Sequence, residues 1–242
     1  MGIIYGKNPV LEAISSGTTI NKIYAQTSNK EIDSVIKEAL KRKIIVVNTD
    51  KQKLDKMIDG KNSQGIIASI TDFKYSEVSE IIEYAKSKNE SPFIVILDKI
   101  EDPHNLGAII RSCECMGVHG VIIQKRNACQ ITDTVEKVAA GACSYVKVAR
   151  VTNITESIKE LKKNGLWIYG LDMNGESEVY NTKLEGAIGI VVGNEGSGIS
   201  RLVKENCDAL MKIPMTGKIN SLNASVSVAI TIYEVVRQKN IK

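Results

Sequence analysis

The sequence IGIVVGNEGSG occupies residues 188–198, and the sequence ALMKIPMTGKINSLNAS occupies residues 209–225. In both stretches a short apolar run typical of a buried strand leads into a loop rich in Gly, Ser and Asn. A helix-like segment follows each loop, at residues 200–205 and at residues 225–237. Ligands of α/β sheets bind beyond the carboxyl ends of the strands, so the two loops predict a pocket at one sheet edge. A cofactor is its expected occupant.

Short apolar runs alternate with segments of helical periodicity throughout the chain after Pro92. This alternation predicts an α/β domain with a mostly parallel sheet and helices on both faces. The expected strands are residues 93–97, 120–123, 144–148, 167–171, 188–192 and 209–213. The expected helices are residues 106–116, 132–140, 154–164, 200–205 and 225–237.

The first part of the chain has the pattern of a smaller α/β unit. Apolar residues at helical spacing predict helices at residues 9–15 and 28–42, and β-branched runs predict strands at residues 21–25, 44–47 and 65–70. Residues 71–91 have apolar positions at helical spacing and polar ends, as in a connecting helix. We therefore predict one domain at residues 1–72, a linker at residues 73–90 and a second domain at residues 91–242.

The composition is that of a globular protein: the 242 residues are 43% hydrophobic and 25% charged. No apolar run approaches the roughly 20 residues of a membrane span, and no secretory signal is recognisable, so we expect a cytoplasmic protein without membrane contact. Five cysteines without a Cys-x-x-Cys pair, and only two histidines, argue against a metal site or a disulfide framework. Cys113 and Cys115 are expected to be small buried hydrophobic side chains.

The charge is mildly basic, with a formal net charge of +4. Residues 1–72 contain 11 Lys and Arg against 8 Asp and Glu. A balance of this size permits an anionic partner such as RNA without requiring one, since it is also ordinary for a solvated surface. The run Lys41, Arg42 and Lys43 has the same two interpretations.

Two common nucleotide-binding motifs are absent from the sequence. Gly193, Gly196 and Gly198 follow the spacing G-x-x-G-x-G, which differs from the G-x-G-x-x-G of dinucleotide-binding enzymes, and no G-x-x-x-x-G-K-[ST] is present. A dehydrogenase is therefore a poor interpretation. A glycine cluster alone is equally consistent with a plain tight turn.

Three segments together resemble one family. They are DPHNLGAIIRSC at residues 102–113, GNEGSG at residues 193–198, and the stretch from residue 213 to residue 225. They are similar, in the same order, to the three motifs of the SpoU/TrmH group of RNA ribose 2′-O-methyltransferases in the SPOUT superfamily. YGKNPVLEA at residues 5–13 is similar to the start of that group's substrate-binding domain, so the resemblance covers nearly the whole chain.

The resemblance implies an N-terminal RNA-binding domain and a C-terminal domain tied in a trefoil knot, which forms a homodimer and binds S-adenosylmethionine. The implied reaction is methylation of a ribose 2′-hydroxyl in RNA. The N-terminal domain favours the subgroup that modifies a guanosine of 23S ribosomal RNA over the tRNA subgroup, which generally lacks it. Alternatives are a tRNA methyltransferase, a resistance-type rRNA methyltransferase of the same fold, and a non-catalytic RNA-binding factor for ribosome assembly.

By motif position, the resemblance implies a set of cofactor-binding residues. Gly193 can adopt a positive φ and let a ligand approach the main chain, while Ile213 and Leu222 offer apolar walls. From the residues alone, core packing is the better explanation of Ile213 and Leu222. The full expected set is Gly193, Gly196, Ile213, Met215 and Leu222.

The resemblance also implies the catalytic residues Arg111, Asn105, Glu195, Ser221 and Asn223. Arg111 would either accept the proton of the ribose hydroxyl or, as befits a side chain that stays protonated, hold a phosphate and stabilise the developing alkoxide. Glu195 would orient Arg111 or its own loop, Asn105 and Asn223 would brace it, and Ser221 would lie near the target ribose or phosphate. Taken singly, Asn105 and Ser221 are also ordinary candidates for helix N-caps.

Overall fold

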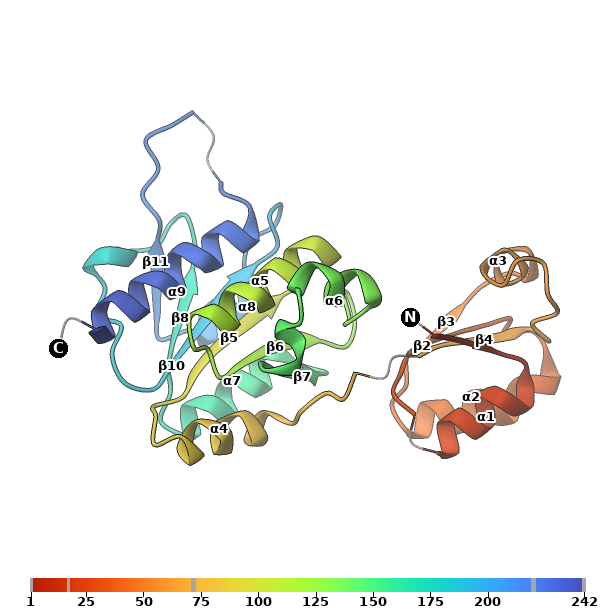
Figure 1. Cartoon of the computed structure of the whole chain (residues 1–242). Helices are drawn as coiled ribbons and strands as arrows, with labels where there is room; N and C mark the ends of the chain where they lie inside the picture. The colour runs from red at the N-terminus through yellow and green to blue at the C-terminus, as the bar shows by residue number, and fades with distance from the viewer. Residues whose placement is uncertain (1, 17, 71–72, 219–220, 241–242) are drawn as a thin grey trace. The chain divides into compact units, whose positions relative to one another are not determined.

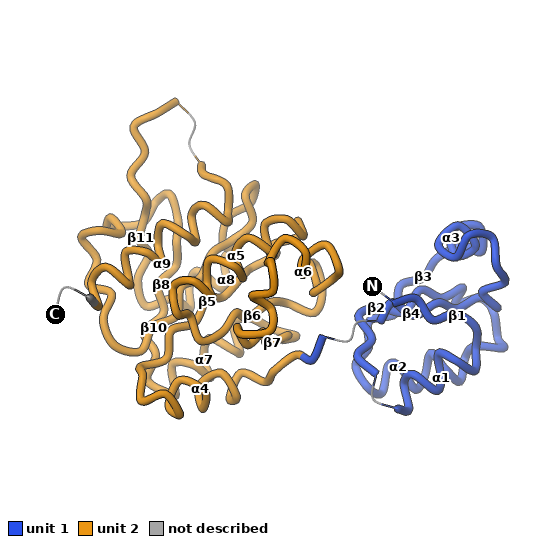
Figure 2. The backbone as a smooth tube through the Cα atoms, in the orientation of Figure 1, with its two compact units in different colours: residues 1–74 blue, residues 75–242 orange. Residues whose placement is uncertain are grey.

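The computed structural model describes residues 2–16, 18–70, 73–218 and 221–240. The chain divides into two compact units, Met1–Lys74 and Tyr75–Lys242, each with its own sheet (Figure 2). The first domain boundary expected from the sequence falls beside residues 71–72, which lie outside the described residues.

The first unit contains a mixed sheet with the strand order β1-β4-β2-β3. In this sheet β4 is antiparallel to both neighbours, whereas β3 is parallel to β2. The strands are β1 (Gly2–Tyr5), β2 (Ile20–Ala25), β3 (Val46–Asn48) and β4 (Ile66–Ile70). The helices are α1 (Lys7–Ser15), η1 (Lys30–Ile32), α2 (Asp33–Lys41) and α3 (Lys51–Met57).

Alternation along β4 divides the core of this unit in two. Ile66 and Ala68 pack with α1 and α2 on one face of the sheet, while Ile67 packs with α3 on the other. The expected strands at residues 21–25 and 65–70 are confirmed, and β3 lies slightly beyond the expected residues 44–47. The sequence interpretation missed β1 and α3, whose four and seven residues are too short for a clear periodicity.

The second unit contains a sheet of seven parallel strands among the described residues, in the order β7-β6-β5-β10-β8-β11-β9. The expected parallel sheet is therefore confirmed. The strands are β5 (Phe93–Asp98), β6 (Gly120–Gln124), β7 (Lys147–Val151), β8 (Trp167–Leu171), β9 (Ser177–Glu178), β10 (Ile188–Gly193) and β11 (Ala209–Lys212). The helices are α4 (Val78–Ser87), α5 (Pro103–Cys115), α6 (Asp133–Ala139), η2 (Ala142–Ser144), α7 (Ile154–Lys163), η3 (Val179–Asn181), α8 (Arg201–Asn206) and α9 (Ala224–Asn240).

Helices cover both faces of this sheet, as expected for an α/β domain (Figure 1). Apolar residues of α4, α7 and α8 share one core cluster with side chains of β5, β6, β8 and β10. On the opposite face, α5 contacts both α6 and α9. The strands β5 and β10 lie at the centre and are buried along their whole length, which explains their uninterrupted apolar sequences. Both strands lead directly into loops of the candidate site.

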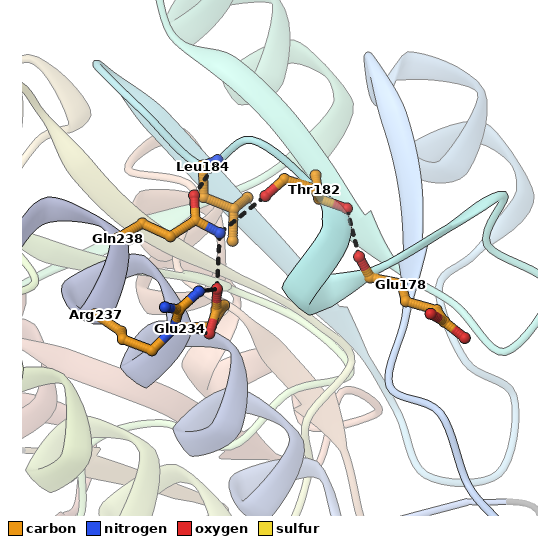
Figure 3. A network of polar contacts seen from close by, with 6 residues as sticks. All are labelled: Glu178, Thr182, Leu184, Glu234, Arg237 and Gln238. Atoms are coloured by element: carbon orange, nitrogen blue, oxygen red, sulfur yellow. Dashed lines mark hydrogen bonds and ion pairs between the residues drawn. The ribbon is translucent and has the colours of Figure 1, made fainter. Parts of the chain in front are cut away.

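The end of α9 is fixed by polar contacts to the segment that precedes β10 (Figure 3). Gln238 Nε2 donates to the carbonyl of Thr182 at 2.9 Å and to Glu234 Oε1 at 2.7 Å, and Gln238 Oε1 accepts from the main-chain N–H of Leu184 at 2.9 Å. The ion pair with Arg237 lowers the pKa of Glu234. The last helix is thus held near its end, and its beginning lies at the candidate site.

Two expectations about smaller features were wrong. The strand expected at residues 144–148 begins at Lys147, because a 3₁₀ turn, η2, takes up the first part of the apolar run. Cys113 is buried as expected, and burial raises its pKa, but Cys115 is exposed because it points away from the sheet at the end of α5. No helix among the described residues is long and apolar enough to cross a membrane.

Candidate active site

The helix α5 begins earlier than its apolar pattern indicates. Asp102 is its N-cap and accepts a hydrogen bond from the N–H of His104 at 3.0 Å, and Pro103 occupies the first turn, where a missing N–H costs nothing. Asn105 therefore lies inside the first turn and is not the cap. Its side chain is buried, with 7% of the residue exposed, whereas Arg111 lies further along α5 and is exposed.

The loop between β10 and α8 closes on itself. Asn194 and Gly198 form an isolated bridge, in which the N–H of Gly198 donates to the carbonyl of Asn194 at 2.8 Å. A Cβ atom on Gly193 would lie 2.1 Å from the carbonyl carbon of Gly198, so only glycine fits there. The residue of this loop with a positive φ is Gly198, at +64°, and not Gly193 as expected. Glycine at position 193 thus serves the close approach of two main-chain segments.

A chain of amide and carboxylate groups links three distant segments. Asn105 Nδ2 donates to Glu195 Oε1, and Asn223 Nδ2 donates to Asn105 Oδ1 at 2.9 Å. Asn223 Oδ1 in turn accepts from the main-chain N–H of Ser225 at 3.0 Å, in the first turn of α9. The helix start is therefore capped by Asn223, while the expected alternative cap, Ser221, lines a pocket.

This pocket lies between the loop after β10 and the loop after β11, where the sequence predicted it. Its volume is about 300 Å³, at the lower end of the roughly 300–1,000 Å³ of small-molecule sites. Each expected cofactor-binding residue lines it, as do two of the expected catalytic residues. These lining residues are Gly193, Gly196, Ile213, Met215, Leu222, Glu195 and Ser221.

A third wall of the pocket was missed in the sequence. It comprises residues 171–174, the last residue of β8 and the start of the loop after it, together with Lys204 of α8. Lys204 Nζ lies 2.5 Å from Asp172 Oδ2, and the N–H of Asn174 donates to Asp172 Oδ1 at 2.9 Å. Burial works to raise the pKa of Asp172, but these hydrogen bonds outweigh burial and lower it. The sequence contained one indication of this wall. The strand expected at residues 167–171 belongs to the same sheet and ends at this loop.

Arg111 lies apart from these contacts. It is not among the lining residues of the pocket, and no hydrogen bond or ion pair joins its side chain to another described residue. Of the two tasks expected of Glu195, the contact with Arg111 is not made, because Glu195 bonds to Asn105 instead. The exposed guanidinium of Arg111 is available to a partner from outside the chain.

The chemistry of the pocket suits a ligand with both apolar and polar parts. Val192, Ile213 and Leu222 provide apolar surface, while the glycine-rich loop brings main-chain groups to the wall. Within the described ranges, no three His, Cys, Asp or Glu side chains are grouped as metal ligands. Asn105 and Glu195 form the polar connection between the pocket loop and α5.

The profiles of two known families match this chain. The profile of the SpoU rRNA methylase family matches residues 92–233, which include α5, both pocket loops and the beginning of α9. The chain belongs to the SpoU family. A second profile, that of the RNA 2′-O-ribose methyltransferase substrate-binding domain, matches residues 3–76. The protein is accordingly an RNA 2′-O-ribose methyltransferase, and its first unit corresponds to a substrate-binding domain.

Similar proteins agree with this membership. YacO of Bacillus subtilis (strain 168), a protein assigned to the TrmH family of tRNA/rRNA methyltransferases, is 40% identical over 98% of this chain and 96% of its own length. The crystal structure of an AdoMet-bound rRNA methyltransferase from Sinorhizobium meliloti matches 97% of this chain and 86% of that chain, with 21% identity and a TM-score of 0.60. That of the TrmH/SpoU tRNA-modifying enzyme of A. aeolicus matches 68% and 85%, with 28% identity and a TM-score of 0.57.

Proposed function

We propose that this SpoU-family enzyme transfers a methyl group from S-adenosylmethionine to the 2′-hydroxyl of a guanosine ribose in 23S rRNA, a step of rRNA processing. The observation that carries the proposal is the chain Glu195–Asn105–Asn223. It joins the pocket loop, the first turn of α5 and the start of α9 through side-chain hydrogen bonds. A ligand pocket is thereby coupled to the helix that bears Arg111.

The pocket is assigned to the cofactor. Ile213, Met215 and Leu222 would hold its apolar parts, and the closed loop at Gly193 and Gly196 would present main-chain groups to its polar parts. When bound, the cofactor supplies an electrophilic methyl group. AdoMet is bound by the S. meliloti enzyme that shares this fold, which supports the same assignment here.

Arg111 is assigned to the RNA. As an exposed guanidinium without a partner among the described residues, it is suited to hold a phosphate beside the target nucleotide in a bidentate manner. From there it would stabilise negative charge on the ribose oxygen, whose proton would pass to solvent or phosphate. Ser221, at the pocket wall, would contact the ribose or phosphate, while Glu195, Asn105 and Asn223 would keep the loops in place.

The preference for rRNA over tRNA rests on the first unit. The rRNA methyltransferase of S. meliloti matches 97% of this chain, whereas the tRNA-modifying enzyme of A. aeolicus matches 68%. The substrate-binding profile covers residues 3–76, the part that a tRNA enzyme of the shorter kind would lack. In the experiment below, a tRNA substrate would place the label in tRNA, and a resistance-type target would place it in another nucleotide of rRNA.

The basic end of α2 is proposed as part of the RNA grip, with different roles for its three residues. Arg42 Nε bonds to Glu38 at 3.0 Å, and its guanidinium also donates to the carbonyl of Ile14, so Arg42 ties α2 to α1. Lys41 and Lys43 are exposed; Lys41 Nζ lies 3.8 Å from Glu38 of the same helix, and neither side chain ties α2 to α1. The double substitution of Lys41 and Lys43 to Ala should weaken RNA binding and leave cofactor affinity unchanged. Unchanged RNA binding would show that Lys41 and Lys43 are not part of the RNA-binding surface.

Further properties follow from the same assignment. We propose a homodimer formed through α9, where Val226, Ile230 and Tyr233 share one exposed face. The trefoil knot of the superfamily is proposed for the second unit, supported by the match of residues 92–233 to the SpoU family profile. The proposed location is the cytoplasm, where RNA and S-adenosylmethionine meet.

The deciding experiment offers labelled S-adenosylmethionine with rRNA and, separately, bulk tRNA from cells that lack this enzyme. Digestion to nucleosides and mass spectrometry identify the product. Label in 2′-O-methylguanosine from 23S rRNA alone is the expected result. Label in tRNA would keep the enzyme class but replace the substrate. Tight cofactor binding without label in either RNA would favour a non-catalytic assembly factor.

A further inference from the structure

The last residue of β5, Asp98, is fully buried and lies opposite Gly193 of β10 in the parallel register. Its Oδ2 atom accepts a hydrogen bond from the main-chain N–H of Ser200 at 2.7 Å. Its Oδ1 atom is buried and has no hydrogen-bond partner among the described residues. Burying a carboxyl group with one oxygen unsatisfied is costly, so a reason other than core stability is needed for an Asp at this position.

Ser200 ends the loop that starts at Asn194. Lys99, the residue after Asp98, contacts the beginning of this loop. Its carbonyl accepts from Asn194 Nδ2 at 3.2 Å, and its own N–H donates to Gln124 Oε1 at 3.1 Å. The loop from Asn194 to Ser200 is thus fastened at its beginning by Lys99 and at its end by Asp98.

These contacts are needed because the sequence of this loop allows many main-chain conformations. It follows Gly193 and contains Gly196 and Gly198, and glycine has more conformational freedom to lose than other residues. Ser200 has no side-chain hydrogen bond of its own at the start of α8. The contact with Asp98 is therefore the polar tie that fixes where the loop ends and α8 begins.

We propose that Asp98 is a positioning residue, which holds the loop at residues 194–200 so that Glu195 reaches Asn105 and Gly196 and Ser197 form the pocket wall. The inference rests on the proposed function, because it takes the pocket to bind the cofactor and the contact of Glu195 to support methyl transfer. Asp98 itself is not among the lining residues of the pocket.

Asp98→Ala and Asp98→Asn separate positioning from general stability. Asn is isosteric and retains an oxygen that accepts from the N–H of Ser200, whereas Ala removes it. Ser200→Pro tests the contact from the other side and serves if Asp98→Ala fails to fold: it deletes the N–H donor, and the φ of Ser200, −64°, suits proline.

The matched control is Asp208→Ala. Asp208 Oδ2 likewise accepts a main-chain N–H, that of Ile168 at 2.8 Å, and Oδ1 pairs with Lys162 at 2.6 Å. Asp208 precedes β11 and contacts the start of β8, so it lies at the opposite end of the strands from the pocket loops. Its loss should lower the midpoint of thermal unfolding without changing the loop.

Three quantities are measured at a temperature where every variant is folded: amide hydrogen exchange of residues 194–200, the dissociation constant for S-adenosylmethionine by calorimetry, and kcat with the RNA substrate. For Asp98→Ala and Ser200→Pro we expect exchange of the loop to rise about tenfold or more. Cofactor affinity should fall about tenfold, and kcat about 10–100-fold, as for a misplaced catalytic group. Asp98→Asn should restore all three to within about threefold of the wild type, since the accepting oxygen remains.

Three outcomes would overturn the proposal. Loop exchange and cofactor affinity unchanged in Asp98→Ala would show that the loop does not depend on Asp98. Equal changes in Asp208→Ala would reduce the effect to general destabilisation, and a defect in Asp98→Asn equal to that in Asp98→Ala would contradict the role of the hydrogen bond. If the wild type methylates no RNA, the proposed function fails, but exchange and calorimetry still decide the role of Asp98.

Discussion

Asn105 and Glu195 are 90 residues apart in the sequence and are joined by a hydrogen bond from Nδ2 to Oε1. The other side of the same amide, Oδ1, accepts from Asn223. Both ends of a buried amide are therefore engaged, which fixes its orientation and makes each contact dependent on the other. The three sequence motifs thus form one connected polar unit.

The pair should be energetically coupled. Asn105→Ala and Glu195→Ala each remove the contact, so the double variant should lose less than the sum of the two single losses in kcat/KM. A hydrogen bond to a charged group contributes about 1.5–3 kcal/mol, so we expect a coupling free energy of this size. Steady-state kinetics of the wild type, the two single variants and the double variant measure this coupling. Strict additivity would show that the contact has no part in methyl transfer.

Arg111→Ala should strongly slow methyl transfer while leaving cofactor binding intact. Arg111 does not line the pocket, so the dissociation constant for S-adenosylmethionine should stay within about twofold, whereas loss of an electrostatic stabiliser lowers kcat by about 10²–10³-fold. Arg111→Lys should recover little, because lysine lacks the bidentate geometry. Single-turnover transfer and calorimetry check the two statements, and a variant that loses both functions together would contradict the separation.

Gly193→Ala should prevent closure of the loop after β10. The added methyl group would lie 2.1 Å from the carbonyl carbon of Gly198, a main-chain atom that cannot move aside alone. We expect a loss of about 1–3 kcal/mol in the free energy of unfolding, together with loss of cofactor binding. Gly217→Ala is the matched control for stability, because no atom of the described residues beyond its chain neighbours lies within 4 Å of its added methyl group. Chemical denaturation of both variants gives the comparison.

His119 should make stability depend on pH near neutrality. The N–H of Phe93 donates to His119 Nδ1 at 3.0 Å, which requires the neutral ring, and Nε2 lies 3.1 Å from the carboxylate of Glu90. Burial lowers the pKa of His119; Glu90 acts in the opposite direction, and Lys239 and Lys88 add to the lowering. The ring of Tyr84 lies edge-on, 6.2 Å away.

A lowered pKa in the folded state means that the unfolded chain takes up the proton first. Stability is therefore complete above the unfolded pKa of about 6.5 and is lost as the pH falls from there to the folded pKa, by at most about 1.4 kcal/mol per pH unit. His119→Asn keeps an acceptor near the position of Nδ1 but does not titrate. Its unfolding free energy should vary less between pH 7 and pH 5 than that of the wild type. Parallel curves for the two proteins would exclude His119 as the source.

The exposed face of α9 should determine the oligomeric state. Val226, Ile230 and Tyr233 are 44%, 39% and 56% exposed, while Val228 and Ile232 on the other side of α9 are buried. The wild type should have twice the chain mass of 26.5 kDa in solution, and Ile230→Asp should have the single mass, because a charge in an apolar interface is strongly unfavourable. Light scattering measures both. Leu202→Asp, at another exposed apolar residue, should leave the mass unchanged.

The fold could be predicted from the sequence wherever burial imposes a simple period. The central strands β5 and β10 are buried on both faces and therefore read as unbroken apolar runs. The wall formed by Asp172, Met173 and Asn174 could not be recognised in the same way. Nothing in these residue types indicates a pocket, and only the strand order, with β8 between β10 and β11, brings them to it.

The candidate site, too, could be predicted only in part from the sequence. The pocket loops were predictable from glycine and apolar patterns, but the partner of Glu195 was not. Arg111 and Asn105 are six residues apart on α5, and six residues rotate a side chain by about 240° around a helix axis. The two side chains therefore face different directions, and Glu195 meets the one that points inward. That direction is set by the buried face of α5, where Asn105 lies beside Leu106 and Ile109.

The closed loop at Gly193, Gly196 and Gly198 has a consequence for inhibition. Three residues of this wall have no side chain, so its shape is that of the main chain. A compound shaped to this wall would present few side chains whose replacement could weaken it, and replacing Gly193 would damage the cofactor site itself. Resistance to such a compound would have to arise elsewhere, at walls built from side chains such as the one formed by Met173 and Lys204.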